Sequence, residues 1–170
     1  MLQEAGSKVD TSKETMPDTT PRIQLTPETY LGATRMQFFH PGRIADSGTH
    51  QFKLPSDIPE NNFSFGGTWT IGDEYAMAGE KATLALNFNA ENVFLVMRSG
   101  SAKQNVHVKV YIDGKLVDSK DAGADVKNGE VTVDTDRLYH VLKVSGGVSN
   151  HLLKLEFLTP GTECYAFTFG

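Results

Sequence analysis

Cysteine is nearly absent from this chain: among its 170 residues, only Cys164 carries a thiol. A single cysteine excludes an intrachain disulfide, a CxxC dithiol and a cysteine-rich zinc site. The chain therefore cannot cycle as a dithiol oxidoreductase by itself. Cys164 lies in the alternating run C-Y-A-F-T-F, and this pattern predicts a small side chain on a strand rather than a reactive thiol.

Long apolar runs and clusters of positive charge are also missing. No apolar run reaches the ~20 residues that a membrane-spanning helix needs, and the N-terminus lacks the apolar core of a signal peptide. The 16 Lys and Arg residues are outnumbered by 21 Asp and Glu residues, which gives a net charge of −5. We therefore expect a soluble chain that binds neither nucleic acid nor an anionic membrane.

Catalytic motifs are missing as well: G-x-S-x-G, HExxH, the P-loop and the dinucleotide glycine motif do not occur. Asp73 and Glu74 suggest a glycosidase pair, but neighbours on a strand point to opposite faces, whereas glycosidase carboxylates flank one bond. Asp134-Thr135-Asp136 resembles part of a calcium loop without the glycine and glutamate of an EF-hand. We expect no catalytic residue and no cofactor, and the sequence leaves open a structural calcium ion.

Composition divides the chain into a linker and one β-rich domain. Residues 1–24 are mostly polar, and the stretch from Gly6 to Arg22 contains two prolines and almost no large apolar side chain. Such a segment cannot bury enough apolar surface to fold, so we expect a disordered linker. Residues 25–170 are expected to form a β-sandwich domain.

Apolar and polar residues alternate in several short segments of this domain, notably 82–88, 106–112 and 153–157, and the run of aromatic residues in 165–169 closes the chain. This period of two is typical of strands with one buried face. Asp113-Gly114 and Asn128-Gly129 favour tight hairpin turns. Eight to ten short strands predict an all-β fold, an antiparallel two-sheet β-sandwich of the jelly-roll type.

Aromatic residues with polar neighbours are the remaining functional signal. Sugar sites on β-sandwiches combine an aromatic wall with a few fixed polar groups, and this pairing makes Trp69, Tyr75, Tyr139, Arg35 and Arg137 the candidate ligand-binding residues. Two alternatives stay open. Trp69 shares a strand face with Ile71 and is more often a core residue in such a pattern, and Arg137 could brace a loop against a carboxylate.

Five segments give the domain a distinctive signature: TPETYLGATRMQFF, GTWTIGDEYA, VYIDGK, DRLYHVLK and LEFLTPGTECYAFTFG. In this order they resemble the C-terminal domain of the DipZ group, bacterial thioredoxin-like thiol:disulfide interchange proteins of the cytochrome c biogenesis type. The resemblance extends from about Leu25 to Gly170. Cys164 departs from it, because a small residue such as Ala is expected there.

The resemblance implies a larger parent protein, anchored in a membrane and exposed to the periplasm or cell envelope. That parent carries a membrane-embedded electron-transfer segment, a thioredoxin domain with CxxC, and this domain appended last. Residues Leu2–Gly6 match the end of the final helix of the upstream thioredoxin domain. The resemblance also implies a fold similar to carbohydrate-binding modules, and it assigns the redox activity to the parts that precede this chain.

Two main hypotheses follow. In the first, the domain is a non-catalytic binding module that holds a carbohydrate or glycosylated envelope component and tethers the redox domain near it. In the second, it is a protein-interaction module that packs on the thioredoxin domain or a protein partner. A glycosidase remains only if Asp73 or Glu74 faces another acid across a cleft.

Overall fold

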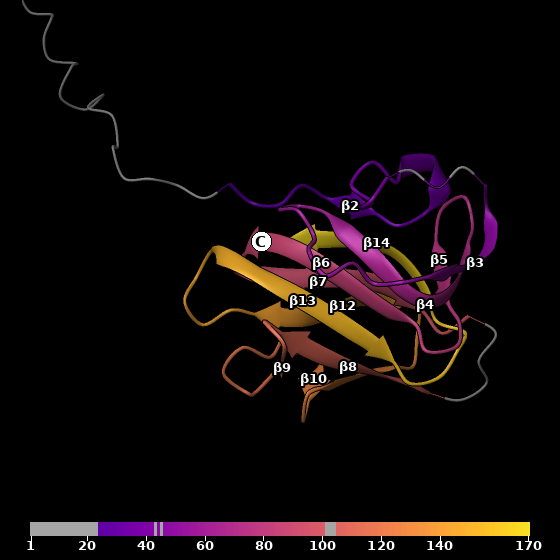
Figure 1. Cartoon of the computed structure of the whole chain (residues 1–170). Coiled ribbons are helices and arrows are strands. Elements are labelled where there is room, and N and C mark those ends of the chain that lie inside the picture. Colours follow the sequence, from indigo (N-terminus) through magenta and orange to yellow (C-terminus); the bar gives the residue numbers. More distant parts are fainter. Residues whose placement is uncertain (1–23, 43, 45, 101–104) are drawn as a thin grey trace, which may run out of the picture.

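The computed structural model describes residues 24–42, 44, 46–100 and 105–170, and the predicted linker up to residue 23 lies outside them. Within these residues, the 3-10 helix η1 (Ala33–Arg35) is the only helical element. The strands form two sheets that share one hydrophobic core (Figure 1). This arrangement confirms the predicted all-β, antiparallel two-sheet sandwich.

The first sheet has the strand order β10-β11-β8-β13-β6-β4, with β9 beside β8. Its strands are β10 (Val126–Lys127), β11 (Glu130–Val133), β8 (Val106–Ile112), β13 (Ser149–Phe157), β6 (Thr83–Ala90), β4 (Phe63–Ile71) and β9 (Lys115–Leu116). The second sheet has the order β3-β4-β5-β14-β7-β12, with β2 beside β14. Its further strands are β3 (Gly48–Phe52), β5 (Ala76–Ala78), β14 (Glu163–Phe169), β7 (Asn92–Arg98), β12 (Arg137–Lys143) and β2 (Thr29–Tyr30).

Strand β4 belongs to both sheets because it changes partner at two consecutive glycines. Residues 63–66 pair with β6, whereas residues 67–71 pair with β3. Gly67 has φ +77°, and a Cβ atom there would lie 2.1 Å from the backbone oxygen of Lys81. Only glycine therefore fits at the point where the strand passes from one sheet to the other.

Trp69, in the second half of β4, is a core residue with no exposed surface. Its ring packs 4.7 Å from that of Phe65 and 5.3 Å from that of Phe157, measured between centroids. Its indole N–H donates to the carbonyl oxygens of Gly66 and Thr83 at 3.0 and 3.1 Å. The core interpretation of Trp69 is confirmed, since its single polar atom is satisfied inside the protein.

The structure also confirms the turns and the buried strand faces that the sequence predicts. Asp113 and Gly114 have φ values of 51° and 84° between β8 and β9, and Asn128 and Gly129 have 53° and 79° between β10 and β11. The alternating apolar residues of β6, β8 and β13 are buried: Leu84, Leu86, Phe88, Val106, Val108, Val110, Leu153, Leu155 and Phe157. Cys164 is also completely buried on a strand, as the sequence predicts.

Strand β14 departs from the simple alternation. Its register against β7 shifts between Cys164 and Ala166, because a β-bulge places an extra residue there. The side chain of Tyr165 consequently lies half-buried, while Phe167 is fully buried. The bulge thus turns Tyr165 away from the core and toward the outer surface of the second sheet.

Candidate ligand-binding face

Three tyrosines from distant parts of the chain meet on the outer surface of the second sheet. Tyr30 lies in β2, Tyr75 directly precedes β5, and Tyr165 lies in β14. The ring centroids of Tyr75 and Tyr165 are 5.5 Å apart, and Tyr30 pairs with Ala166, the residue after Tyr165. All three side chains are half-buried, so each keeps part of its ring accessible.

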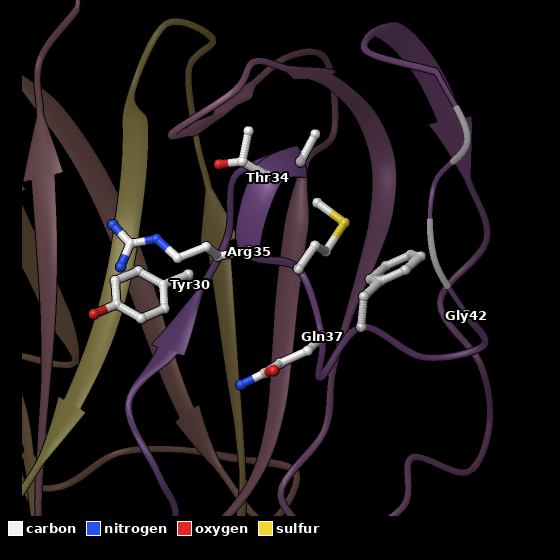
Figure 2. A pocket seen from close by; sticks show the side chains of 8 residues that line it. Tyr30, Thr34, Arg35, Gln37 and Gly42 are labelled. Carbon is white, nitrogen blue, oxygen red and sulfur yellow. The ribbon is translucent and has the colours of Figure 1, made fainter.

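Two exposed arginines accompany these tyrosines. The guanidinium carbon of Arg35 lies 4.0 Å from the ring centroid of Tyr30, and Figure 2 shows the two side chains stacked. The Nη1 atom of Arg98 donates to the hydroxyl oxygen of Tyr165 at 3.1 Å. We call Tyr30, Arg35, Tyr75, Arg98 and Tyr165 the tyrosine face.

Helix η1 is held against the turn that precedes Tyr75. The N–H of Ala33 donates to the Gly72 carbonyl at 2.9 Å, and the N–H and hydroxyl of Thr34 donate to the Asp73 carbonyl at 3.1 and 2.7 Å. At Gly32 a Cβ atom would lie 2.3 Å from the carbonyl carbon of Glu74. Glycine there allows the two segments to touch, and this contact brings Arg35 and Tyr75 into one region of the surface.

Carboxylates fix the arginine at the other end of the tyrosine face. Arg98 Nε lies 3.0 Å from Asp136 Oδ2, and Arg98 Nη1 lies 4.0 Å from Glu163 Oε1. The hydroxyl of Tyr165 donates to Glu163 Oε1 at 3.0 Å. Donors and acceptors therefore stand next to an aromatic ring with their positions set by one another.

Both hydrogen-bonded phenols are neutral near pH 7, and their surroundings raise their pKa above the usual value. The hydrogen bond to Glu28 raises the pKa of Tyr30 above its usual value. Burial raises the pKa of Tyr165 despite the opposing effect of Arg98. Hydrogen bonds to Tyr165 and Asp136 raise the pKa of Arg98, which remains a cation. Each hydroxyl proton is donated to a neighbouring carboxylate, Glu28 for Tyr30 and Glu163 for Tyr165, and each tyrosine offers a ring face to a ligand.

The tyrosine face contains two depressions, one on each side of Ala166. The first, of about 500 Å³, is lined by Tyr30, Ala33, Thr34, Arg35, Met36, Gln37, Phe39 and Gly42 (Figure 2). The second, of about 280 Å³, is lined by Val96, Arg98, Asp136, Arg137, Leu138 and Tyr165. Ala166 separates them, because it pairs with Tyr30 on one side and with Val96 on the other.

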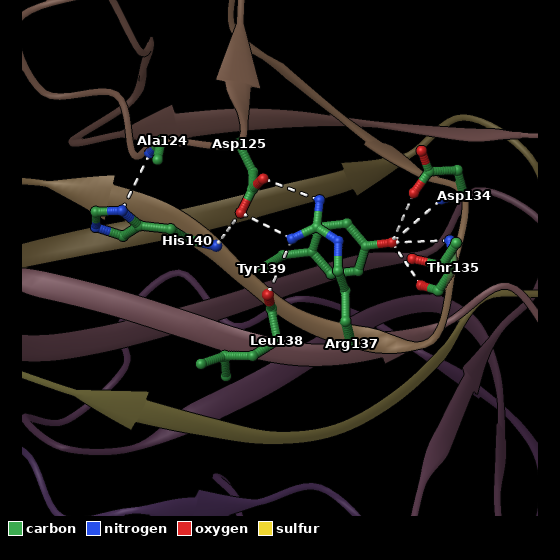
Figure 3. A network of polar contacts seen from close by, with 8 residues as sticks. All are labelled: Ala124, Asp125, Asp134, Thr135, Arg137, Leu138, Tyr139 and His140. Carbon is green, nitrogen blue, oxygen red and sulfur yellow. Dashed lines mark hydrogen bonds and ion pairs between the residues drawn. The ribbon is translucent and has the colours of Figure 1, made fainter.

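Arg137 and Tyr139 serve a different purpose in the structure. Arg137 forms two hydrogen bonds to the carboxylate of Asp125, at 2.9 and 3.2 Å, and stacks on the ring of Tyr139 at 4.0 Å (Figure 3). The Tyr139 hydroxyl accepts the N–H groups of Asp134 and Thr135, both at 3.1 Å. The alternative interpretation of Arg137, a loop brace against a carboxylate, is confirmed.

The five candidate residues from the sequence are consequently not one site. Arg35 and Tyr75 lie in the tyrosine face, and Arg137 borders its second depression. Trp69 and Tyr139 are both completely buried, so neither ring can act as a sugar-stacking platform. Their burial follows from tertiary packing, which residue type and local alternation do not reveal.

The sequence analysis did not predict Arg98 and Tyr165 as site residues. Arg98 could have been found, because Asn92, Phe94, Val96 and Arg98 alternate with the buried residues of β7 and so lie on its outer side. Tyr165 had no such signal, because simple alternation places it on the same face as Phe167.

The described part of the chain carries neither a metal-binding cluster nor a membrane-spanning helix. No group of three or more His, Cys, Asp or Glu side chains there could hold a metal ion. Among the same residues, no helix has the length and apolar character to cross a bilayer.

Fold and face together define a β-sandwich domain with an aromatic and arginine-bearing sheet surface. A family model described as the thioredoxin like C-terminal domain matches residues 26–170, and the chain belongs to this family. The matched residues include every strand described above. The DipZ resemblance drawn from the sequence is confirmed.

Two curated relatives are Protein DipZ of Mycobacterium bovis and Protein DipZ of Mycobacterium tuberculosis. Each is 36% identical to this chain over 87 residues, which is 51% of the chain. The match spans only 12% of each relative. A solved structure, an active site mutant of a family two carbohydrate esterase from Clostridium thermocellum, matches with a TM-score of 0.42 and 16% identity, over 74% of this chain and 32% of that one.

Proposed function

We propose that this domain is a non-catalytic binding module that holds carbohydrate on its tyrosine face. The observation that carries the proposal is the Arg98–Tyr165–Glu163 cluster, in which an accessible ring stands beside donors and acceptors at 3.0 to 3.1 Å. A pyranose has an apolar face that packs on an aromatic ring and hydroxyl groups that need both kinds of hydrogen-bond partner. Sites with an apolar wall and a few fixed polar groups suit such a ligand.

Preorganisation supports the same proposal. Arg98 is held by Asp136 and Tyr165, and Arg35 is stacked on Tyr30. Because these long side chains are already positioned, binding a sugar costs less conformational entropy than ordering two free arginines. The paired carboxylates Asp136 and Glu163 also offset the charge of Arg98, which favours a neutral sugar over an acidic one.

We further propose a task for the domain in its parent protein. We place it in a membrane-anchored thiol:disulfide oxidoreductase, on the extracytoplasmic side, after the thioredoxin domain. Binding an envelope glycan or a glycosylated partner there raises the local concentration of the redox domain near its substrates without new chemistry. The thiol chemistry itself belongs to the thioredoxin domain.

Thermal unfolding in the presence of saccharides tests the proposal. A ligand at about ten times its Kd adds about 1.4 kcal/mol to the free energy of unfolding, which raises Tm by about 3 °C for a domain of this size. We expect a selective rise with one class of mono- or oligosaccharide, with and without calcium. The variants Tyr75→Ala and Arg98→Ala should lose the rise.

Tyr111→Ala is the matched control. Tyr111 is a half-buried tyrosine with Lys154 over its ring at 4.9 Å, but it lies in β8 of the first sheet. The saccharide-induced rise in Tm should persist in this variant. A panel in which no saccharide changes Tm, or in which the rise survives both Tyr75→Ala and Arg98→Ala, contradicts the proposal.

A protein-interaction module is the second candidate, and one feature of the same face favours it. Leu138 is 46% exposed beside Val96 in the second depression, which provides apolar surface for a protein partner. Sedimentation of this domain joined to its own thioredoxin domain separates the two functions. Compact docking that Leu138→Asp abolishes favours the interaction module, and independent domains favour the tethered carbohydrate module.

A further inference from the structure

Ser149, His151 and Asp113 form a hydrogen-bonded chain in the first sheet, outside the tyrosine face. Ser149 Oγ lies 2.8 Å from His151 Nε2, and His151 Nδ1 lies 2.5 Å from Asp113 Oδ2. Ser149 and His151 are two residues apart on β13, so their side chains project from the same side of the strand. Asp113 reaches them from the turn between β8 and β9.

The position of Asp113 is fixed by the backbone of β13. Its Oδ1 atom accepts the N–H of Leu152 at 2.9 Å, and its own N–H donates to the Leu152 carbonyl at 2.8 Å. One carboxylate oxygen is thereby occupied, and the other faces the imidazole. The carboxylate therefore holds the His151 ring in one orientation.

The polarity of this chain follows from the chemistry of its members. An ionised carboxylate only accepts hydrogen bonds, so Nδ1 of His151 carries the proton of the neutral imidazole. Nε2 is then an acceptor, and the Ser149 hydroxyl lies 2.8 Å from it, in position to donate. The Gly147 carbonyl can accept the same hydroxyl proton, but it lies farther away, at 3.2 Å. A serine hydroxyl that donates to a carboxylate-oriented imidazole is the arrangement that activates serine as a nucleophile.

Solvent reaches the imidazole and the carboxylate of this hydrogen-bonded chain, and Ser149 is half-buried. The His151 side chain is 23% exposed and that of Asp113 is 54% exposed. Gly146 and Gly147 precede Ser149, and a Cβ atom at either would meet nothing within 4 Å. A small reagent can therefore approach Ser149 beside this turn.

We propose that Ser149 is a nucleophilic serine that accepts an acyl group from a reactive carboxylic ester. Its Oγ attacks the carbonyl carbon while its proton passes to Nε2 of His151. The bond between the carbonyl carbon and the alcohol oxygen then breaks, the alcohol leaves with that proton, and Ser149 remains as an ester. This reaction is stoichiometric and independent of sugar binding at the tyrosine face.

A fluorophosphonate probe on the 170-residue protein tests the nucleophile, because the serine oxygen bonds to phosphorus while fluoride leaves. We expect one adduct on the peptide that contains Ser149. Ser149→Ala and His151→Asn should abolish it, and Asp113→Asn should slow it by about tenfold or more, since the amide can stabilise the wrong imidazole tautomer. With p-nitrophenyl acetate, one equivalent of nitrophenolate should appear in a Ser149-dependent step.

Ser145→Ala is the matched control, because Ser145 is an exposed serine four residues away whose N–H donates to Asp121. This variant should be labelled like the wild type. Urea denaturation of Asp113→Asn and His151→Asn, followed by circular dichroism, verifies that they fold. A protein without an adduct at Ser149, or with one that folded His151→Asn does not reduce, overturns the proposal and leaves the three residues as a structural tie between β13 and the β8–β9 turn.

Discussion

Arg98 donates a hydrogen bond to the hydroxyl of Tyr165 across the boundary between β7 and β14, at 3.1 Å. The contact exists because a β-bulge directs Tyr165 outward beside the last residue of β7. Tyr165 in turn donates to Glu163 at 3.0 Å, so its hydroxyl connects a cation with a carboxylate. A local irregularity of one strand thus produces the most polar part of the tyrosine face.

Tyr165→Phe should weaken carbohydrate binding while leaving the fold intact. The variant keeps the ring and its packing against Tyr75 but removes the hydroxyl that orders Arg98 and Glu163. Binding must then order Arg98 and Glu163, which costs about 1–3 kcal/mol for the two side chains, or about a fivefold to hundredfold rise in Kd. Titration of the saccharide identified by thermal shift measures this change.

Phe94→Leu provides the comparison for that titration. Phe94 is a half-buried aromatic residue of β7 that stacks on His140 at 4.6 Å, outside the two depressions. The Phe94→Leu variant should bind the saccharide with a Kd within about twofold of the wild type, a change in binding free energy of less than about 0.5 kcal/mol. An equal loss of affinity in both variants contradicts a specific role for the Tyr165 hydroxyl.

Gly67→Ala should destabilise the domain strongly. The new methyl group meets the Lys81 carbonyl oxygen at 2.1 Å, and φ is +77°. The combined steric and backbone cost is about 3 kcal/mol. Gly146→Ala, where a Cβ atom meets nothing within 4 Å, should change the free energy of unfolding by less than about 1 kcal/mol. Urea denaturation of both variants measures the difference, and similar stabilities would show that β4 does not need glycine at its bend.

Sequence patterns predicted the strands better than the surface of the sandwich. Local alternation identified the buried faces of β6, β8 and β13, because side chains on a strand alternate between two faces. The turn residues Asp113 and Asn128, each followed by glycine, marked two hairpins, because few residues adopt positive φ. These patterns are local, so they can be interpreted without knowing which strands pair with one another.

The tyrosine face depends on non-local features instead. The passage of β4 between sheets at Gly67 and the bulge at Tyr165 are set by strand pairing, which a single sequence does not display. The prediction from aromatic residues with polar neighbours is therefore only partly right: Tyr75 lies in the tyrosine face, whereas Trp69 and Tyr139 lie in the core. Sugar binding by the face remains a prediction.

The ion pair between Arg137 and Asp125 should make stability depend on pH in the acid range. The hydrogen bond from Arg137 lowers the pKa of Asp125 in the folded state. A lowered folded pKa gives stability that is present above the unfolded value of about 3.9 and is lost as the pH falls through the folded value. Arg137→Met should therefore destabilise the domain near neutral pH and do so less at low pH.

Urea denaturation of this variant at several pH values measures the effect, with Arg35→Met as the comparison. Arg35 stacks on Tyr30 at 4.0 Å, as Arg137 stacks on Tyr139 at 4.0 Å, so this variant removes a similar arginine–tyrosine stack. The penalty of Arg35→Met should change less with pH over this range. A penalty of Arg137→Met that is constant from neutral to acid pH contradicts the role of the Asp125 pair.

The thiol of Cys164 should be inert in the folded domain. It has no exposed surface, and burial raises its pKa far above that of a free thiol, with a smaller contribution from Glu163. Because the thiolate is the reactive form, a disulfide reagent should modify Cys164 only when the chain unfolds. The modification rate in increasing urea should follow the unfolding transition, and the fully unfolded chain should react with one equivalent. If the native domain reacts at a rate close to that of the unfolded chain, the thiol of Cys164 is not inert. Cys164 would then be able to take part in the thiol chemistry that we assign to the thioredoxin domain.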